Sequence, residues 1–312
     1  MLALLAPGQG AQTPGFLTPW LEDAASKELV SHWSTLIDLD LIALGTTADA
    51  DEIRETSHAQ PLLVTAGLIS FTQAFAGQNI SFDFFAGHSV GEITAAGMAG
   101  SFDGDSALTL VNVRGRAMST AATGSNTGMS AVLGGEREVV VEALLALGLT
   151  PANENGGGQI VAAGSLDALA KLAENPPAGA RVRPLQVSGA FHTSVMQPAV
   201  TALADAASKI SVTNPSAPVI SNKDGAIITD GNELVARIVG QVSGPVRWDL
   251  CMQTMADQGV TGVIEVAPGG TLTGLIKRAQ PGIELFALKT PDDIAAAREF
   301  ARTHAGNGNG AK

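Results

Sequence analysis

The chain has 312 residues, of which 45% are hydrophobic and 15% charged, and its formal net charge at pH 7 is −12. A chain of this size can bury a large core, in one large domain or two modest ones. Its 18 lysines and arginines are scattered, which argues against nucleic-acid binding, because phosphate contacts need clustered cations. No apolar run approaches the roughly 18–20 residues of a membrane span, and residues 1–7 lack the basic segment of a signal peptide.

Cysteine content and short motifs exclude further classes. Cys251 is the only cysteine, so an internal disulfide is excluded and a reducing compartment, the cytoplasm, is expected. The sequence has no Cys/His cluster and no His-Glu-x-x-His spacing, so we expect no metal site. It also has no P-loop and no convincing Gly-x-Gly-x-x-Gly, so we expect no nucleotide cofactor.

The first third of the chain alternates strand-like and helix-like segments, as α/β layer folds do. We expect a strand at residues 2–6, helical material over most of 15–79 (56–75 being the clearest piece), a strand at 82–87 and a helix over 105–122. The final third returns to this pattern, with strands near 219–220, 262–266 and 285–288. Together these segments predict an α/β, hydrolase-like core with a parallel sheet.

The middle of the chain has a different pattern. From about residue 125 the order is strand, helix, strand, strand, helix, strand, ending in a strand at 181–187. This βαββαβ order is the ferredoxin-like motif. We therefore predict a ferredoxin-like small subdomain over 125–188, inserted into a core made of 1–124 and 189–304. The Gly- and Asn-rich residues 305–312 are expected to be a disordered tail.

The segment Gly87-His88-Ser89-Val90-Gly91 joins the expected strand at 82–87 to a helix-forming stretch. In this context Gly-x-Ser-x-Gly forms a nucleophile elbow, a tight turn that exposes the serine hydroxyl above the sheet. The glycines are needed because the crowded turn leaves no room for Cβ atoms. The following helix would direct free N–H groups at negative charge beside Ser89. We predict that Ser89 is a nucleophile; a purely structural turn is the alternative.

A serine nucleophile needs a base, and the chain has five histidines. His32 and His58 lie in helix-like segments, and His88 adjoins the nucleophile, so that its side chain points away from it. His304 falls in a C-terminal segment that we expect to fray. His192 lies on a loop after a strand-like run, where bases are common. We predict that His192 is the base; a solvated loop histidine is the alternative.

Arg114 falls on the apolar stripe of the expected helix at 105–122, together with Ala107, Val111 and Met118. A guanidinium on this stripe is costly unless it meets a partner. The partner is either a buried carboxylate, in a structural salt bridge, or an anionic group of the substrate. A substrate carboxylate would match the fork of the arginine in two hydrogen bonds. Periodicity leaves both alternatives open.

Over residues 3 to about 303 the chain resembles the malonyl-CoA:acyl carrier protein transacylases of fatty acid and polyketide synthesis. Seven segments in the right order carry the resemblance: Pro7-Gly8-Gln9-Gly10-Ala11-Gln12, Ala59-Gln60-Pro61, Gly87-His88-Ser89-Val90-Gly91-Glu92, Val113-Arg114-Gly115-Arg116-Ala117-Met118, Asn153-Glu154-Asn155 with Gln159-Ile160-Val161-Ala162-Ala163-Gly164, Gly189-Ala190-Phe191-His192-Thr193, and Gln241-Val242-Ser243-Gly244-Pro245-Val246-Arg247-Trp248.

The resemblance implies roles that spacing alone does not give. Ser89 would be acylated, with His192 as its base. The backbone carbonyl of Gln241 would orient the base, where a hydrolase triad uses Asp. The N–H groups of Gln9 and Val90 would form the oxyanion hole.

The resemblance also implies substrate contacts. Arg114 would hold the malonyl carboxylate, with Gln60 in a supporting role. Phe191 is similar to the residue of malonyl-selecting members, whereas methylmalonyl-selecting members tend to carry a smaller one there. Asn155 would contact the substrate from the small subdomain. Gly244 departs from the family pattern, because Asn is usual there and could hydrogen-bond the base loop, so the rigidity of that loop is in question.

The implied function is transfer of a malonyl group from malonyl-CoA to the phosphopantetheine thiol of acyl carrier protein, by a monomer without a cofactor. One alternative is a serine hydrolase such as a thioesterase, which normally places an acid between nucleophile and base in chain order. A neutral acyl chain would also leave Arg114 without a purpose. The other alternative is a non-catalytic carrier-docking module. The sequence does not distinguish fatty acid from polyketide synthesis.

Acidic carrier proteins and the phosphates of coenzyme A both require local cations on a chain of net charge −12. The paired cations Arg181/Arg183 and Lys277/Arg278 are the candidates. Ordinary solvated surface charges are the alternative.

Overall fold

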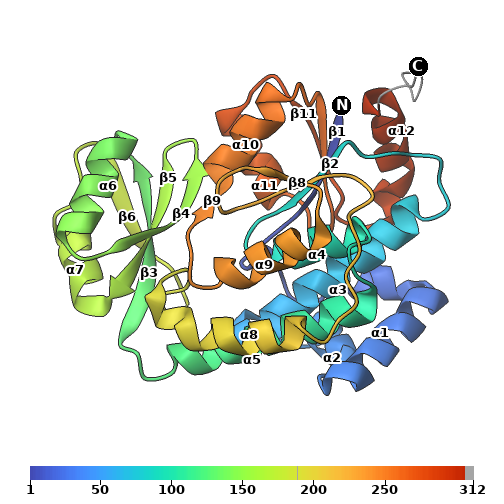
Figure 1. The fold of residues 1–312 in the computed structure, drawn as a ribbon, viewed down its shortest axis with the longest axis horizontal. Coiled ribbons are helices and arrows are strands. Elements are labelled where there is room, and N and C mark those ends of the chain that lie inside the picture. The colour runs from blue at the N-terminus through green and yellow to red at the C-terminus, as the bar shows by residue number, and fades with distance from the viewer. Residues whose placement is uncertain (188, 306–312) are drawn as a thin grey trace.

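The larger of two β-sheets lies inside the molecule. In the computed structural model, which describes residues 1–187 and 189–305, the chain forms these two sheets with helices packed around them (Figure 1). The larger sheet has the order β11-β10-β1-β2-β7-β8. Its strands are β1 (Leu2–Ala6), β2 (Phe84–Gly87), β7 (Val219–Ile220), β8 (Ile227–Ile228), β10 (Gly262–Glu265) and β11 (Glu284–Ala287). Neighbouring strands are parallel except β7 and β8.

Both faces of this sheet are covered, as parallel sheets require. Along β1, Leu2 and Leu4 belong to one apolar cluster and Ala3 and Leu5 to the other, because successive side chains of a strand point to opposite faces. The first cluster includes residues of α1 (Ala24–Ile37), α2 (Leu41–Thr46), α3 (Thr56–Phe75), α4 (Gly91–Met98), α5 (Gly104–Ala122), α8 (Gln197–Ala207), α9 (Gly231–Gln241) and α12 (Ile294–His304). The second includes residues of α10 (Trp248–Asp257) and α11 (Thr271–Ala279). The predicted α/β fold is confirmed.

The smaller sheet has the order β6-β3-β5-β4-β9. Its first four strands, β3 (Thr127–Gly134), β4 (Thr150–Gly156), β5 (Gln159–Ser165) and β6 (Ala180–Pro184), pair antiparallel and alternate with α6 (Arg137–Ala146) and α7 (Leu166–Glu174). The predicted βαββαβ order is observed. The two helices and the sheet share an apolar cluster that includes Val132, Leu144 and Leu172.

The edge strand of the smaller sheet comes from much later in the chain. β9 (Val246–Arg247) pairs in parallel with β4, with Asn153 opposite Val246 and Glu154 opposite Arg247. Val246 is fully buried and belongs to the apolar cluster of α10 and α11 on the larger sheet. Arg247 Nε lies 3.4 Å from the Glu154 carboxylate. Strand β9 therefore ties the smaller sheet to the larger unit, and no pattern in the sequence predicted it.

Some sequence-based expectations are wrong in detail. His304 does not fray: it is a buried residue of α12, with its Nδ1 3.1 Å from Thr261 Oγ1. The strand expected at 181–187 ends at Pro184, after which residues 185–187 line the cleft described below. The tail predicted at 305–312 lies outside the described residues except for Ala305. Among the helices of the described ranges, none has the length and apolar character needed to span a bilayer.

Candidate active site

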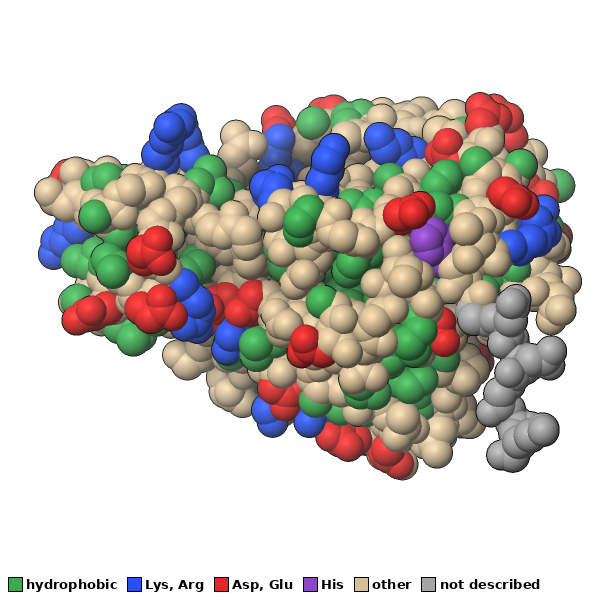
Figure 2. All heavy atoms as spheres, turned by 90° about the horizontal axis from the view of Figure 1, so that it is seen from above, with side chains coloured by type: hydrophobic (Ala, Val, Ile, Leu, Met, Phe, Trp, Pro, Cys, Tyr) green, Lys and Arg blue, Asp and Glu red, His purple; other side chains and the backbone are tan. Residues whose placement is uncertain are grey.

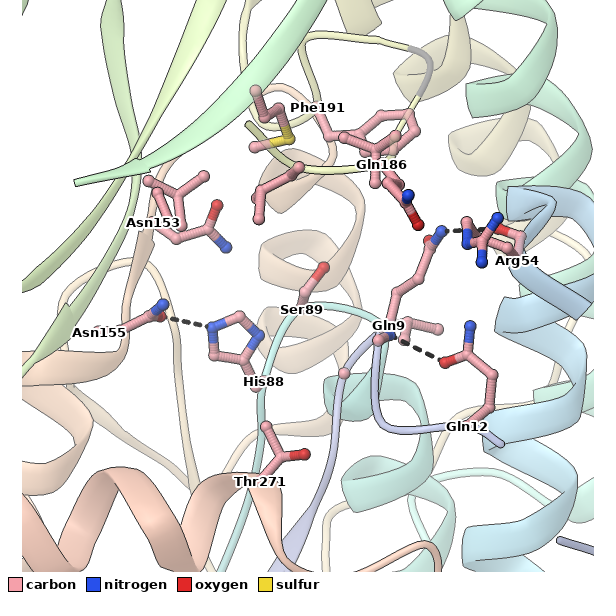
Figure 3. Close-up of a pocket in the computed structure, with 18 of the residues that line it drawn as sticks. Gln9, Gln12, Arg54, His88, Ser89, Asn153, Asn155, Gln186, Phe191 and Thr271 are labelled. Atoms are coloured by element: carbon pink, nitrogen blue, oxygen red, sulfur yellow. Dashed lines mark hydrogen bonds between the residues drawn. The ribbon is translucent and has the colours of Figure 1, made fainter. Parts of the chain in front are cut away.

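A cleft of about 830 Å³ is lined by residues from both sheets and their loops. In Figure 3, Ser89 lies near its centre, with Asn153 and Asn155 of β4 on one side and Gln9 and Gln12, from the loop after β1, on the other. Every site residue predicted from the sequence lines this cleft except Gln241, which lies behind it. The structure therefore brings together residues that are far apart in the chain.

Ser89 stands at the turn between β2 and α4, and its backbone has a φ of 54°. A left-handed conformation at a non-glycine residue costs roughly 1–2 kcal/mol and is typical of functional turns. The flanking glycines are required by contact: a Cβ on Gly87 would overlap the carbonyl of Gly91, and one on Gly91 would overlap the carbonyl of Ala6. Ser89 N–H donates to Asn222 Oδ1 at 2.8 Å. The geometry is that of a nucleophile elbow.

His192 is placed as a base for this serine. Its Nε2 lies 2.8 Å from Ser89 Oγ, and its Nδ1 lies 2.9 Å from the carbonyl oxygen of Gln241. Because a carbonyl only accepts, Nδ1 carries the proton and Nε2 is free to accept the serine proton. Burial, and then the positive charge of Arg114, lower the pKa of His192 to about 3. The imidazole is therefore neutral near pH 7, the form that a base needs.

Gly244 fixes the loop that orients the base. Its N–H donates to the Gln241 carbonyl oxygen at 3.1 Å, so this oxygen accepts from both Gly244 and His192. The bond uses the backbone, which any residue at position 244 supplies. The rigidity of the loop therefore has a source other than the asparagine side chain usual in this place.

The N–H groups of Gln9 and Val90 lie on the two segments that border the elbow. Val90 immediately precedes α4, and Gln9 follows β1. The loop after β1 packs tightly on the elbow, since a Cβ on Gly8 would lie 2.8 Å from the His88 carbonyl oxygen. In the described part of the chain neither N–H has an acceptor. Free N–H donors beside a nucleophile are what an oxyanion hole requires.

Arg114 is 1% exposed, and its guanidinium faces the nucleophile. Its Nη1 donates to Gln60 Oε1 at 2.7 Å, and its Nη2 donates to Gln241 Oε1 at 2.9 Å and to Ser89 Oγ at 3.2 Å. Within the described residues Arg114 forms no salt bridge, and its buried Nε has no partner. Burial lowers the pKa of Arg114 to about 10, which leaves it charged at pH 7. In this part of the chain, the structural salt bridge that was the alternative for this arginine is therefore not formed.

The remaining predicted residues surround this centre. Gln60 Nε2 lies 3.5 Å from Met118 Sδ, so the amide is fixed between α3 and α5. Phe191 precedes the base and is 7% exposed at the cleft wall. Asn155 lines the cleft but its Oδ1 accepts from His88 Nε2 at 2.8 Å (Figure 3). Asn155 thus links the elbow to the smaller sheet as well as facing the cleft.

Two buried polar residues behind the nucleophile were missed by sequence reasoning. Glu92 is 1% exposed, and its Oε1 accepts from Asn222 N–H at 2.6 Å while its Oε2 accepts from Gln241 Nε2. Asn222 Nδ2 donates to the Gly87 carbonyl at 2.8 Å. Burial raises the pKa of Glu92 to about 7, while both of its oxygens accept N–H donors, the arrangement of an ionised carboxylate. The only feature of the sequence that could have indicated Glu92 is its position directly after the elbow motif. No feature of the sequence indicated Asn222.

Among the described residues, no group of three or more His, Cys, Asp or Glu side chains is placed to hold a metal ion.

Comparison with known proteins places the chain in a family. Residues 5–288 match the model of the acyl transferase domain. The malonyl CoA-acyl carrier protein transacylase of Mycobacterium tuberculosis strain H37Rv is 47% identical over 299 residues, covering 94% of this chain and 98% of that protein. The Escherichia coli K12 protein of the same name is 36% identical, covering 96% of this chain and 99% of that protein.

Solved structures agree with the sequence comparisons. The crystal structure of the M. tuberculosis enzyme superposes with a TM-score of 0.91, at 47% identity, over 95% of this chain and 99% of that one. A malonyl-transacylase solved in complex with its type II polyketide synthase acyl-carrier protein gives 0.88 at 29% identity, over 96% of this chain and 99% of that one. The chain belongs to the acyl transferase family and, within it, to the malonyl CoA-acyl carrier protein transacylases.

Proposed function

We propose that the protein transfers a malonyl group from malonyl-CoA to the phosphopantetheine thiol of an acyl carrier protein, through a malonyl ester of Ser89. The observation that carries this proposal is Arg114, a buried cation beside Ser89 Oγ that forms no salt bridge in the described part of the chain. A buried guanidinium without a carboxylate is costly and fits an anionic ligand. A malonyl group carries its carboxylate one methylene from the thioester carbonyl, so both ends can be held at once.

The dyad supports a double-displacement mechanism. Ser89 Oγ attacks the thioester carbon while His192 Nε2 takes the serine proton. The N–H groups of Gln9 and Val90 stabilise the oxyanion of the tetrahedral intermediate. Collapse of the intermediate breaks the carbon–sulfur bond, and His192 returns the proton to the leaving coenzyme A thiolate. The carrier thiol then repeats the steps in reverse order, forming the malonyl thioester and restoring Ser89.

Two observations support the proposed substrates. The cleft is lined by many side-chain amides, among them Gln12, Asn153, Gln159 and Gln186, which suit the two amide groups of a pantetheine arm. The related malonyl-transacylase crystallised with an acyl-carrier protein supports such a carrier as the acceptor here.

The same geometry supports the remaining assignments. Nucleophile, base and oxyanion donors all come from one chain, so the proposed transfer takes no catalytic group from a second copy or from a cofactor. The cleft lies where residues 1–124 and 189–304 face residues 125–188, which supports a division at these positions. The single cysteine, Cys251, is buried, and burial raises its pKa well above the ordinary value, which suits an unreactive thiol in the cytoplasm.

The carrier surface is proposed from exposed cations. Arg181, Arg183, Lys277 and Arg278 are all exposed, and Arg278 borders the cleft. On the face shown in Figure 2, several Lys and Arg side chains lie along the upper edge of the view, although the whole chain is acidic. Local cations of this kind would attract an acidic carrier and the phosphates of coenzyme A.

Intact-protein mass spectrometry after incubation with malonyl-CoA tests the proposal. A transferase accumulates a malonyl adduct on Ser89 that disappears when holo carrier protein is added and reappears as malonyl carrier. A serine hydrolase turns malonyl-CoA over to malonate without a carrier, and a docking module forms no adduct; either result would contradict the proposal.

A further inference from the structure

Three buried side chains, Glu92, Gln241 and Arg114, are hydrogen-bonded in a row that ends beside the nucleophile. Glu92 Oε2 accepts from Gln241 Nε2, and Gln241 Oε1 accepts from Arg114 Nη2 at 2.9 Å. Arg114 Nη2 in turn lies 3.2 Å from Ser89 Oγ. All three linked side chains are at most 5% exposed. The amide of Gln241 therefore lies between two buried opposite charges.

The orientation of the Gln241 amide decides what Arg114 meets. With Oε1 toward Arg114, the guanidinium has an acceptor; with the amide turned over, two donors would face each other. Nε2 is surrounded by three acceptors: the Glu92 carboxylate, the Ser89 carbonyl at 3.1 Å and Asn222 Oδ1 at 3.1 Å. Glu92 carries the only charge among them, and hydrogen bonds to charged groups are the stronger ones.

The Gln241 amide also keeps Glu92 out of direct contact with Arg114, so the guanidinium can bind a substrate carboxylate. A carboxylate in direct contact with the guanidinium would occupy the donors that a substrate carboxylate needs. Glu92 is separated from Arg114 by one amide; in the described part of the chain, Arg114 Nε has no partner and Nη2 lies beside Ser89 Oγ. The electrostatic effect of Glu92 favours the charged form of Arg114.

We infer that Glu92 is a positioning residue for substrate selection: acting through the side-chain amide of Gln241, it holds the Arg114 guanidinium in place for a substrate carboxylate. This inference rests on the proposed malonyl transfer. The backbone carbonyl of Gln241 orients His192, whereas this inference gives the side chain of Gln241 a separate function in orienting Arg114.

The test is Glu92→Gln, which keeps the shape of the side chain. Its single amide oxygen can accept from Asn222 N–H or from Gln241 Nε2, and its NH2 must then face the other donor. Self-acylation of Ser89 is measured with malonyl-CoA and with acetyl-CoA, which lacks the carboxylate. We expect kcat/KM for malonyl-CoA to fall on the order of 10–100-fold, as for loss of a hydrogen bond to a charged group, and the acetyl rate to change less than about threefold. An unchanged malonyl-to-acetyl ratio would overturn the inference.

Glu265→Gln is the matched control. Glu265 is also a fully buried carboxylate, and it accepts from the N–H groups of Gly270, Leu272 and Thr273 at the start of α11. Its loss should lower the thermal stability of the protein and leave the malonyl-to-acetyl ratio as in the wild type. A ratio that falls equally in both variants would make Glu92 a merely structural residue and contradict the inference.

Gln241→Met supplies a second, independent route. It removes the amide and leaves the backbone carbonyl that His192 uses, so it should lower the malonyl-to-acetyl ratio as Glu92→Gln does. The double variant should be no worse than the worse single variant, because both changes break one chain of contacts. Additive losses would show that Glu92 acts by another path. If Glu92→Gln does not fold, Gln241→Met still decides: an unchanged ratio overturns the inference.

Failure of this inference is distinct from failure of the proposed function. Absence of a malonyl adduct in the wild-type protein would contradict the proposed transfer. A normal wild-type adduct together with an unchanged ratio in the Glu92 variant would contradict only the positioning role.

Discussion

Arg114 and Ser89 are in direct contact: guanidinium Nη2 lies 3.2 Å from the hydroxyl oxygen. The same hydroxyl lies 2.8 Å from His192 Nε2, so it can donate to the base while accepting from the cation. The group proposed to bind the substrate carboxylate thus also touches the nucleophile. Replacement of Arg114 therefore removes a hydrogen-bond donor from the nucleophile as well as the proposed site for the substrate carboxylate.

The first prediction concerns the order of steps. A single nucleophile with a single base should acylate and deacylate in turn, so initial rates measured against malonyl-CoA at several carrier concentrations should give parallel double-reciprocal lines. Ser89→Ala should form no covalent adduct, as judged by intact mass. Lines that intersect in the wild-type protein would rule out the double displacement.

The second prediction is an inversion of selectivity at Arg114. Leaving one partner of a desolvated arginine–carboxylate pair unmatched costs ~3–5 kcal/mol. Arg114→Ala should therefore lose malonyl transfer by orders of magnitude and gain relative activity toward acetyl-CoA. Arg116→Ala, on the exposed side of the same helix, is the control and should keep the wild-type preference. A malonyl preference that survives in Arg114→Ala would contradict the assignment.

The third prediction is the pH dependence of the base. Burial and the charge of Arg114 hold the pKa of His192 at about 3. His192 should therefore stay neutral between pH 8 and pH 5. In this range, labelling of Ser89 by a small neutral sulfonyl fluoride should not slow through protonation of His192. Arg114→Gln removes a cation that disfavours the imidazolium, so the pKa of His192 should rise and the acidic limb should move to higher pH. Arg116→Gln should not move it. A limb that stays in place or moves to lower pH in Arg114→Gln would contradict this electrostatic coupling.

The fourth prediction concerns the carrier surface. Charge reversal at Arg181/Arg183 or at Lys277/Arg278 should raise KM for the carrier, most strongly at low ionic strength, because screening weakens charge steering. Acylation of Ser89 by malonyl-CoA should survive in the Arg181/Arg183 variant. Lys209→Glu, a change at an exposed residue that pairs with Asp205 in the native protein, is the control. Unchanged carrier kinetics in both double variants would place the docking surface elsewhere.

Local patterns predicted much of the fold. The helix predicted at 56–75 is α3, and the stripe that put Arg114 toward the core is correct, because periodicity reports directly which side of a helix is buried. The two-residue strand β9 left no such pattern, and its pairing with β4 depends on the packing of both units. The prediction that the segment around His304 frays was wrong, because its polar residues gave no indication that one face of α12 packs on β10.

The site was predictable where side-chain chemistry is distinctive. Ser89 has a motif, and His192 could be reached by elimination among five histidines. Every residue has a backbone carbonyl, so the sequence alone cannot indicate that the carbonyl of Gln241 orients the base. Only the family resemblance suggested this role. Glu92 stands in the first turn of α4, where an acidic residue usually indicates a solvated charge at the helix N-terminus. Its burial follows from tertiary packing that no local window contains.

Strand β9 has a consequence for modular engineering. Residues 125–188 are continuous in the chain, yet the sheet that they form is completed by Val246 and Arg247. An excised copy of that segment would expose an unpaired β4 edge and leave the Glu154 carboxylate without Arg247. A transplant of the segment into another transferase therefore has to carry residues 246–247 with it or supply an equivalent strand.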